Sequence, residues 1–267
     1  MASPFGSHSP FFHNGPIARS VDDAALLLRV LSGLYRDDPF SIETPAAGFR
    51  DLAADGGVSG LRVAYSPDMG YFPVAGEVAR LCRKAVARLE DEGCIVEEVS
   101  MGLDEEVEAD FMTLWRFKLL GLYGALPAQD LQRLEPRVLQ LIEEGRGLSV
   151  DDLARANRGR ERVWQALQAA LSGRDLLLCP CTSLPAFPVA DDLPSAVEGV
   201  PINPLLGWFL TYPINLTGNP AASIPAGLTS DCLPVGLQII GRRLEDRLVL
   251  RVSRAMEQIA PWQRFAA

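Results

Sequence analysis

Residues 61–99 carry the pattern that most restricts the fold, because they read as strand, helix and strand in succession. A short apolar run from Leu61 to Tyr65 precedes an amphipathic stretch from Glu77 to Glu92, which Gly93 ends. A second strand-like run follows from Cys94 to Val99. Two strands joined through a helix pair in parallel within one sheet. The sequence therefore predicts an α/β fold.

The rest of the chain supplies further elements for the same layered fold. Predicted strands cover residues 175–179, 221–224 and 235–240. Predicted helices cover residues 20–33, 104–145 in pieces, 149–173 and 245–259. We expect a mixed β-sheet flanked by helices, with long loops at residues 182–204 and around Asn215. Loops of that length in a compact α/β fold tend to serve function.

The first predicted helix has a defined start and a defined apolar side. The hydroxyl of Ser20 can cap the first turn, where acidic residues also favour the positive end of the helix dipole. Val21, Leu27, Leu28 and Leu31 fall on one face at helical spacing. We expect that shared face to be the apolar side of the helix.

Charge and cysteine content exclude several classes of protein. Asp and Glu total 34 against 25 Lys and Arg, a net charge of −9, which disfavours nucleic acid and anionic lipid as partners. Residues 199–230 carry no charge, but five prolines interrupt them, so they cannot form a membrane-spanning helix. The five cysteines form no Cys-x-x-Cys pair, which argues against a disulfide scaffold and favours the cytoplasm.

No catalytic motif stands out from the residues alone. The nucleophile elbow, the phosphate-binding loop and the dinucleotide-binding glycine pattern are absent from the sequence. His13 reads as a loop histidine bonded to backbone, while Lys84 and Lys118 read as surface lysines. Cys179 and Cys181 lack further ligands nearby and read as buried small residues, so no metal site is predicted.

Four stretches, in order and spacing, nevertheless resemble one enzyme family. The segment from His13 to Asp23 resembles the Gly-Pro-Met-Ala-Arg-Thr-Val-x-Asp segment of the amidase signature family. Residues Gly60–Ala64 look like the strand that follows it. Residues Asn215–Gly227 and Leu233–Arg243 resemble its C-terminal block. The resemblance implies hydrolysis of carboxamide C–N bonds without a metal or other cofactor.

The same resemblance implies that the catalytic groups lie outside this chain. Family members use a serine nucleophile, a second serine in a cis peptide and an unprotonated lysine as base, all before the Gly-Pro-Met-Ala-Arg segment. Here that segment starts twelve residues after Met1, and neither Lys84 nor Lys118 matches the base. We therefore expect residues 1–267 to form the C-terminal part of a single amidase domain, with an incomplete fold and no catalytic residue.

Substrate contacts are expected from the loop before Asn215, which lines the acyl pocket in family members. The candidate substrate-binding residues are Trp208, Thr211, Tyr212, Asn215 and Thr217. In the glutamine-binding component of glutamyl-tRNA amidotransferase, a carboxylate near the position of Trp208 helps to bind glutamine. An indole there favours an apolar or aryl amide instead. The competing interpretation is that Trp208 and Tyr212 only pack the core.

Three functions remain open from the sequence. The leading one is an amidase-family hydrolase fragment that is inert alone and is complemented by a separate N-terminal half. An incomplete sheet exposes strand edges, so self-association is the other expected outcome. The second is a non-catalytic binding or scaffolding subunit that keeps the remnant of the fold. The third is an independent cysteine hydrolase that uses Cys181 with His13.

Overall fold

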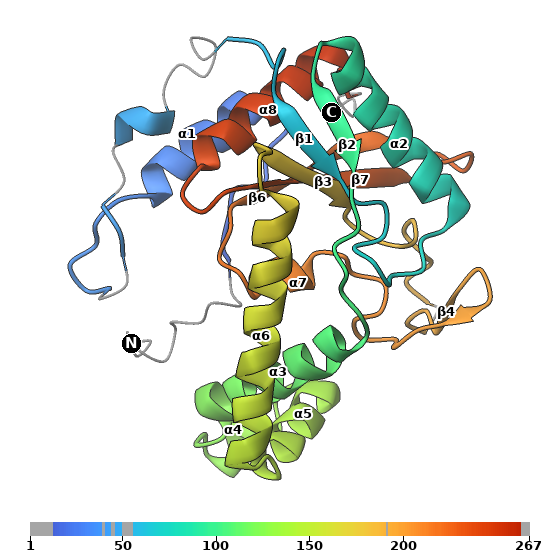
Figure 1. Cartoon of the computed structure of the whole chain (residues 1–267). Helices are drawn as coiled ribbons and strands as arrows, with labels where there is room; N and C mark the ends of the chain where they lie inside the picture. Colours follow the sequence, from blue (N-terminus) through green and yellow to red (C-terminus); the bar gives the residue numbers. More distant parts are fainter. Residues whose placement is uncertain (1–12, 39–40, 44–45, 50–55, 191, 263–267) are drawn as a thin grey trace.

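The computed structural model describes residues 13–38, 41–43, 46–49, 56–190 and 192–262. Their main sheet has five strands in the order β2-β1-β3-β7-β6 (Figure 1). The strands are β1 (Arg62–Tyr65), β2 (Ile95–Glu98), β3 (Leu176–Pro180), β6 (Ala221–Leu228) and β7 (Pro234–Gly241). β1 runs parallel to β2 and β3, whereas β7 runs antiparallel to β3 and β6. The predicted mixed α/β fold is confirmed.

The helices follow the predicted order closely. They are α1 (Val21–Leu31), α2 (Gly76–Asp91), α3 (Glu106–Tyr123), α4 (Ala128–Leu131), α5 (Pro136–Arg146), α6 (Val150–Ala170), α7 (Tyr212–Asn215) and α8 (Asp246–Ile259). A 3-10 turn covers Ala46–Phe49, and β4 (Ala196–Val197) pairs with β5 (Val200–Pro201).

Two hydrophobic cores lie on opposite faces of the sheet, and alternation along β3 builds both. All five residues of β3 are buried. Leu176 and Leu178 join the core beneath α2 and α8, while Leu177 and Cys179 join the core shared with α6 and α7. This period of two is the side-chain geometry of a strand covered on both faces.

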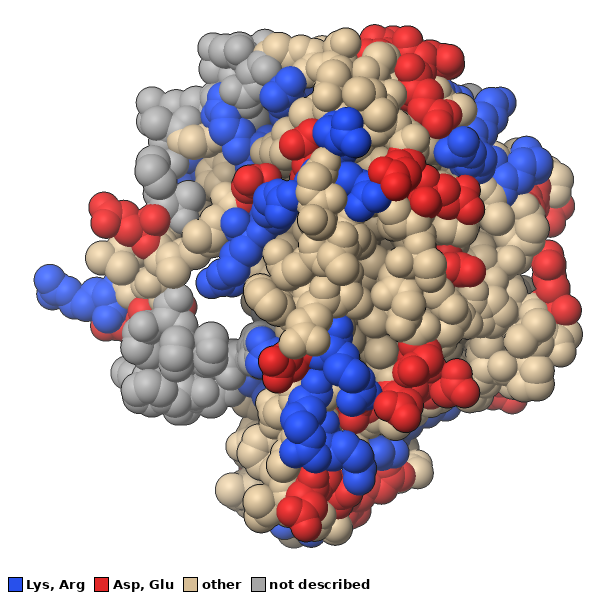
Figure 2. Space-filling view, in the orientation of Figure 1, with Lys and Arg blue, Asp and Glu red and all other residues tan. Residues whose placement is uncertain are grey.

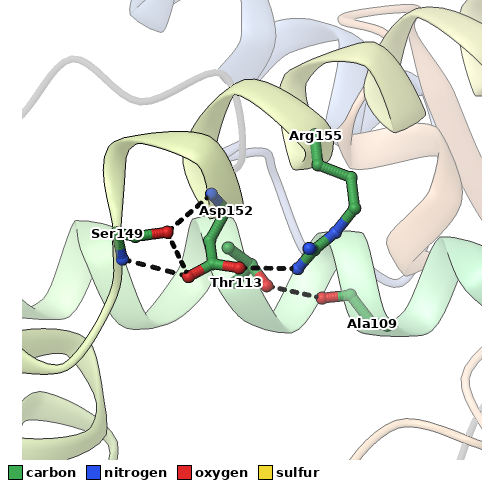
Figure 3. Close-up of polar contacts among 5 residues, drawn as sticks. All are labelled: Ala109, Thr113, Ser149, Asp152 and Arg155. Atoms are coloured by element: carbon green, nitrogen blue, oxygen red, sulfur yellow. Dashed lines mark hydrogen bonds and ion pairs between the residues drawn. The ribbon is translucent and has the colours of Figure 1, made fainter.

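Helix α6 extends from the sheet into a lobe formed with α3 and α5 (Figure 1). Its start is fixed by Ser149, whose Oγ accepts from the Asp152 N–H at 3.1 Å while the Ser149 N–H donates to Asp152 Oδ2 at 3.0 Å (Figure 3). This reciprocal capping box satisfies two backbone donors that a helix end would leave unpaired. The cap predicted at Ser20 is also present, since its Oγ accepts from the Asp23 N–H at 3.2 Å.

Both long loops contain short regular elements that the sequence did not reveal. In the first, β4 and β5 join through Glu198 and Gly199, both at positive φ, as a two-residue hairpin turn requires. The Glu198 carboxylate accepts from the Gly76 N–H at 2.9 Å and so binds the first turn of α2. In the second, the single turn of α7 ends at Asn215.

The apolar face predicted for α1 is only partly buried. Val21 packs with Phe49 and Leu250 of α8, and Leu28 adds to this small core. Leu27 and Leu31 are instead 41% and 59% exposed, because no described element covers the outer side of the helix. The pattern identified the helix correctly but not which of its leucines are covered here.

Candidate functional site

The segment that carries Trp208 is held against the end of β3. The Ser183 N–H donates to the Trp208 carbonyl at 2.9 Å, and the Leu210 N–H donates to the Cys181 carbonyl at 3.1 Å. The half-buried indole of Trp208 lies 3.6 Å from the ring of Phe209, centroid to centroid, and 5.3 Å from that of Phe187. Trp208 therefore belongs to a small aromatic cluster at the carboxyl end of β3.

The polar group of this cluster already has a partner. Trp208 Nε1 donates to the Pro204 carbonyl at 3.0 Å. What the indole offers to a neighbour is its ring, which favours apolar and aromatic contact over recognition of a charged group.

Tyr212 lies deeper, in the core on the α6 side of the sheet. It is only 3% exposed, and its ring contacts Phe111 at 4.9 Å and Phe72 at 5.7 Å, centroid to centroid. Its hydroxyl forms a hydrogen bond with the hydroxyl of Tyr71. Burial raises the pKa of both phenols well above the ordinary value, so both stay neutral. This placement agrees with the interpretation that Tyr212 packs the core.

The remaining candidates lie around and after α7. Thr211 precedes the helix and Asn215 ends it. Thr217 is buried, and its Oγ1 donates to the Ile214 carbonyl at 2.8 Å and accepts from the Asn219 N–H at 3.4 Å. Thr217 thus fixes the backbone that leads from α7 into β6.

Thr217 also lines a cavity of about 820 Å³ between α6 and the turn after β7. Arg160, Trp164, Asn219 and Arg243 are among the other lining residues. Asn219 Nδ2 donates to the Gly241 carbonyl at 2.8 Å, whereas its buried Oδ1 has no hydrogen-bond partner among the described residues. Figure 2 shows Lys and Arg side chains gathered over α6, with acidic side chains beside them.

The five predicted substrate-binding residues therefore have different surroundings. Trp208 lies in the aromatic cluster, Tyr212 in the core, and Thr217 at the cavity beside α6. Sequence reasoning missed Arg160 and Trp164 of that cavity. Their i, i+4 spacing on one face of α6 gives a signal, but the same spacing is common on solvated helices.

The cysteine that could serve as a nucleophile is in an unfavourable setting. Cys181 is buried, and its thiol donates to Ser223 Oγ at 3.1 Å. Burial raises the pKa of this thiol to about 11, so the reactive thiolate is scarce near neutral pH. Cys181 lines a groove beside β6, whereas His13 lines the cavity beside α6. The geometry gives no support to a cysteine-histidine pair.

Neither lysine takes the position of a base in the cavity beside α6. Lys84 is exposed on α2, and Lys118 is half-buried on α3, where burial lowers its pKa. Within the described ranges, no three His, Cys, Asp or Glu side chains lie close enough to hold a metal ion. The described helices include none that is long and apolar enough to cross a membrane.

Comparison with known proteins agrees with this architecture. Residues 6–250 match the family Amidase. An acylamidase of Rhodococcus erythropolis is 34% identical over 252 residues, which cover 94% of this chain and 53% of that protein. The A-type chain of the glutamyl-tRNA(Gln) amidotransferase of Lactococcus lactis is 29% identical, over 91% of this chain and 54% of that protein.

Solved structures give the same result. A bacterial aryl acylamidase of the amidase signature family superposes with a TM-score of 0.84 at 31% identity, over 93% of this chain and 53% of that one. A 6-aminohexanoate cyclic dimer hydrolase superposes with a TM-score of 0.76 at 25% identity, over 92% and 54%. The chain thus spans about half the length of the relatives that it matches. On its sequence match and its fold, the chain belongs to the amidase family.

Proposed function

We propose that this chain is the C-terminal part of a single amidase domain that hydrolyses aryl or other apolar carboxamides once the rest of the domain is supplied. The observation that carries the proposal is the likeness to two acylamidases, at 34% identity in sequence and at a TM-score of 0.84 in structure. Each covers more than nine tenths of this chain.

The chemistry is the family's, and its reactive groups come from the part that this chain does not contain. A serine hydroxyl there attacks the amide carbon while the lysine accepts its proton. The C–N bond then breaks, the amine leaves with a proton, and water releases the acid from the acyl-serine. Backbone N–H groups stabilise the oxyanion. This chain contributes the strands and the loop at residues 208–217 that stand behind the acyl group.

The preference for an aryl or apolar amide rests on Trp208. Its ring lies with Phe187 and Phe209, and its N–H is already used by the Pro204 carbonyl. Such a surface offers apolar contact and no charge for the ammonium group of glutamine. Thr211, Asn215 and Thr217 complete the proposed pocket wall, and Tyr212 holds it from behind. A cytoplasmic location remains a prediction from the cysteines.

The test compares this chain alone with this chain co-expressed with the remaining part of the Rhodococcus erythropolis acylamidase, using 4-nitroacetanilide as substrate. We expect no 4-nitroaniline from the chain alone, and its release from the pair. In the active pair, Trp208→Ala should raise KM about tenfold, whereas Trp208→Phe should keep most of the affinity. A pair that assembles without hydrolysing any anilide would support the non-catalytic subunit instead.

A separate control addresses the cysteine hydrolase. If the chain alone releases 4-nitroaniline and Cys181→Ala removes that activity, the proposal is wrong and the third function is correct. Labelling by a fluorophosphonate probe should likewise be absent from the chain alone, because the proposal places the reactive serine elsewhere.

A further inference from the structure

Strand β6 ends the sheet, and its outer edge is paired with no described strand. On its inner side, the Gly241 N–H of β7 donates to the Pro220 carbonyl at 3.0 Å. Backbone groups alternate in direction along a strand, so residues 222 and 224 also face β7, and Ala221, Ser223 and Pro225 face outward. Proline at an outward position costs no bond to β7. Ala221 and Ser223 offer both a donor and an acceptor.

This edge forms one wall of a groove of about 770 Å³. Residues 15–20 and the first turn of α1 form the opposite wall, and Trp262 also lines the groove. Thr182, Ser223 and Gly236 are small residues, so a backbone can approach the sheet closely here. The groove therefore has the walls and the unpaired edge that an added strand requires.

Next to the groove, α1 presents an apolar outer face to solvent. Val30 and Leu34 are 71% and 73% exposed, and Leu26, Leu27 and Leu31 are also exposed. These side chains follow one another along the helix and the turn after it. Single exposed leucines are ordinary, but a continuous apolar strip of this kind marks a contact surface.

Three observations identify what covers these surfaces. The chain spans only about half the length of its relatives, so about half of an amidase domain is unaccounted for. Residues 15–20, which form a wall of the groove, belong to the segment that follows the catalytic part in the family. The groove and the strip also share an element, because Val21 and Ala24 of α1 line the groove.

A second copy of this chain fits the edge less well. A symmetrical antiparallel pair of β6 strands centred on Ser223 would place Ala221 opposite Pro225 of the other copy. Proline has no N–H, so each such pair would lose one of its two bonds. A strand of different sequence carries no such restriction.

The geometry points to one composite interface, on which the outer edge of β6 and the outer face of α1 receive the other half of the amidase domain, with an extended segment of that half pairing with Ala221 and Ser223. This inference rests on the proposed function for the identity of the partner. It adds the surface and the mode of pairing.

The test measures assembly rather than activity. This chain is co-expressed with the tagged remaining part of the Rhodococcus erythropolis acylamidase, and the recovered complex is weighed by light scattering. We expect a one-to-one complex. The double variant Val30→Glu/Leu34→Glu and the variant Ser223→Pro should each lower recovery at least about tenfold, because they place charge in an apolar contact or remove an edge donor. Val189→Glu, at an exposed apolar residue in the loop before β4, is the matched control.

Hydrogen exchange supplies the second measurement and guards against variants that misfold. In the wild-type complex, exchange at the amides of Ala221 and Ser223 should slow at least about tenfold relative to the chain alone. The inference is overturned if no complex forms, if these amides exchange as before, or if the variants assemble as well as the control. It is also overturned if the chain alone forms a dimer that Val30→Glu/Leu34→Glu dissociates. A complex with the expected protection but no hydrolysis leaves the interface standing and removes the proposed activity.

Discussion

Replacing Tyr212 by Phe separates a core role for this residue from a role in substrate contact. Phe keeps the ring that contacts Phe72 and Phe111, and removes only the hydroxyl that bonds with Tyr71. The Tyr71 hydroxyl then loses its partner in a largely buried setting. Leaving a buried polar group unsatisfied costs about 1–2 kcal/mol.

Urea unfolding followed by circular dichroism measures this cost. With a slope of about 3 kcal/mol per M, a loss of about 1.5 kcal/mol lowers the midpoint by about 0.5 M. Tyr71→Phe is the matched control, and should cost a similar amount. The double variant should cost less than the sum, because it removes both partners of one bond.

The same pair predicts how stability responds to alkaline pH. The pKa of each phenol is raised in the folded chain, so the folded state holds protons that the unfolded state releases above a pH of about 10. The stabilisation is complete below that pH and falls as the pH rises beyond it. The double variant Tyr71→Phe/Tyr212→Phe should lose less stability than the wild type when the pH is raised from about 9 to about 11.

The reasoning fails if Tyr212→Phe unfolds at the wild-type midpoint. If that variant also lowers amide affinity in the complemented enzyme, Tyr212 contacts substrate and the core interpretation is wrong.

Three further predictions follow from packing and burial. Ser149→Ala should lower the unfolding free energy by about 1 kcal/mol in urea titrations, and an unchanged midpoint would deny the cap its role. Gly159→Ala should cost about 1–3 kcal/mol in the same titration, because a Cβ at this site would lie 1.6 Å from Asp110 Oδ2. Ellman's reagent should modify one thiol, the exposed Cys232, in the folded chain and five after denaturation. Rapid reaction of a second thiol, such as Cys82, whose pKa burial raises to about 12, would contradict the packing.

Local patterns were sufficient to predict most of the fold. The strands and helix at residues 61–99 follow from their periodicity, and the capping serines at positions 20 and 149 follow from short-range hydrogen bonding. The β4–β5 hairpin was missed because Glu198 is an unusual residue at positive φ. Leu27 and Leu31 have the spacing of a core face, but their burial depends on what packs outside α1, and a pattern within α1 carries no such information.

The site was less predictable, for a related reason. Its proposed residues are close in sequence, between positions 208 and 217, yet a single helical turn and the end of β3 direct them into different surroundings. The cavity at Thr217 is completed by Arg160 and Arg243, which come from distant parts of the chain. Proximity of that kind arises from tertiary packing, which neither composition nor periodicity records.

Helix α6 gives the lobe and the sheet a mechanical connection. Its 21 residues form a rod about 30 Å long, anchored near one end by Val163 and Leu167 in the sheet's core and at the other by the Ser149 cap. A tilt of about 10° around the sheet end would move the distal end by about 5 Å for a rod of that length. A force applied to the lobe therefore acts through a long lever on a short arm, and it reaches the strands reduced in amplitude but increased in strength.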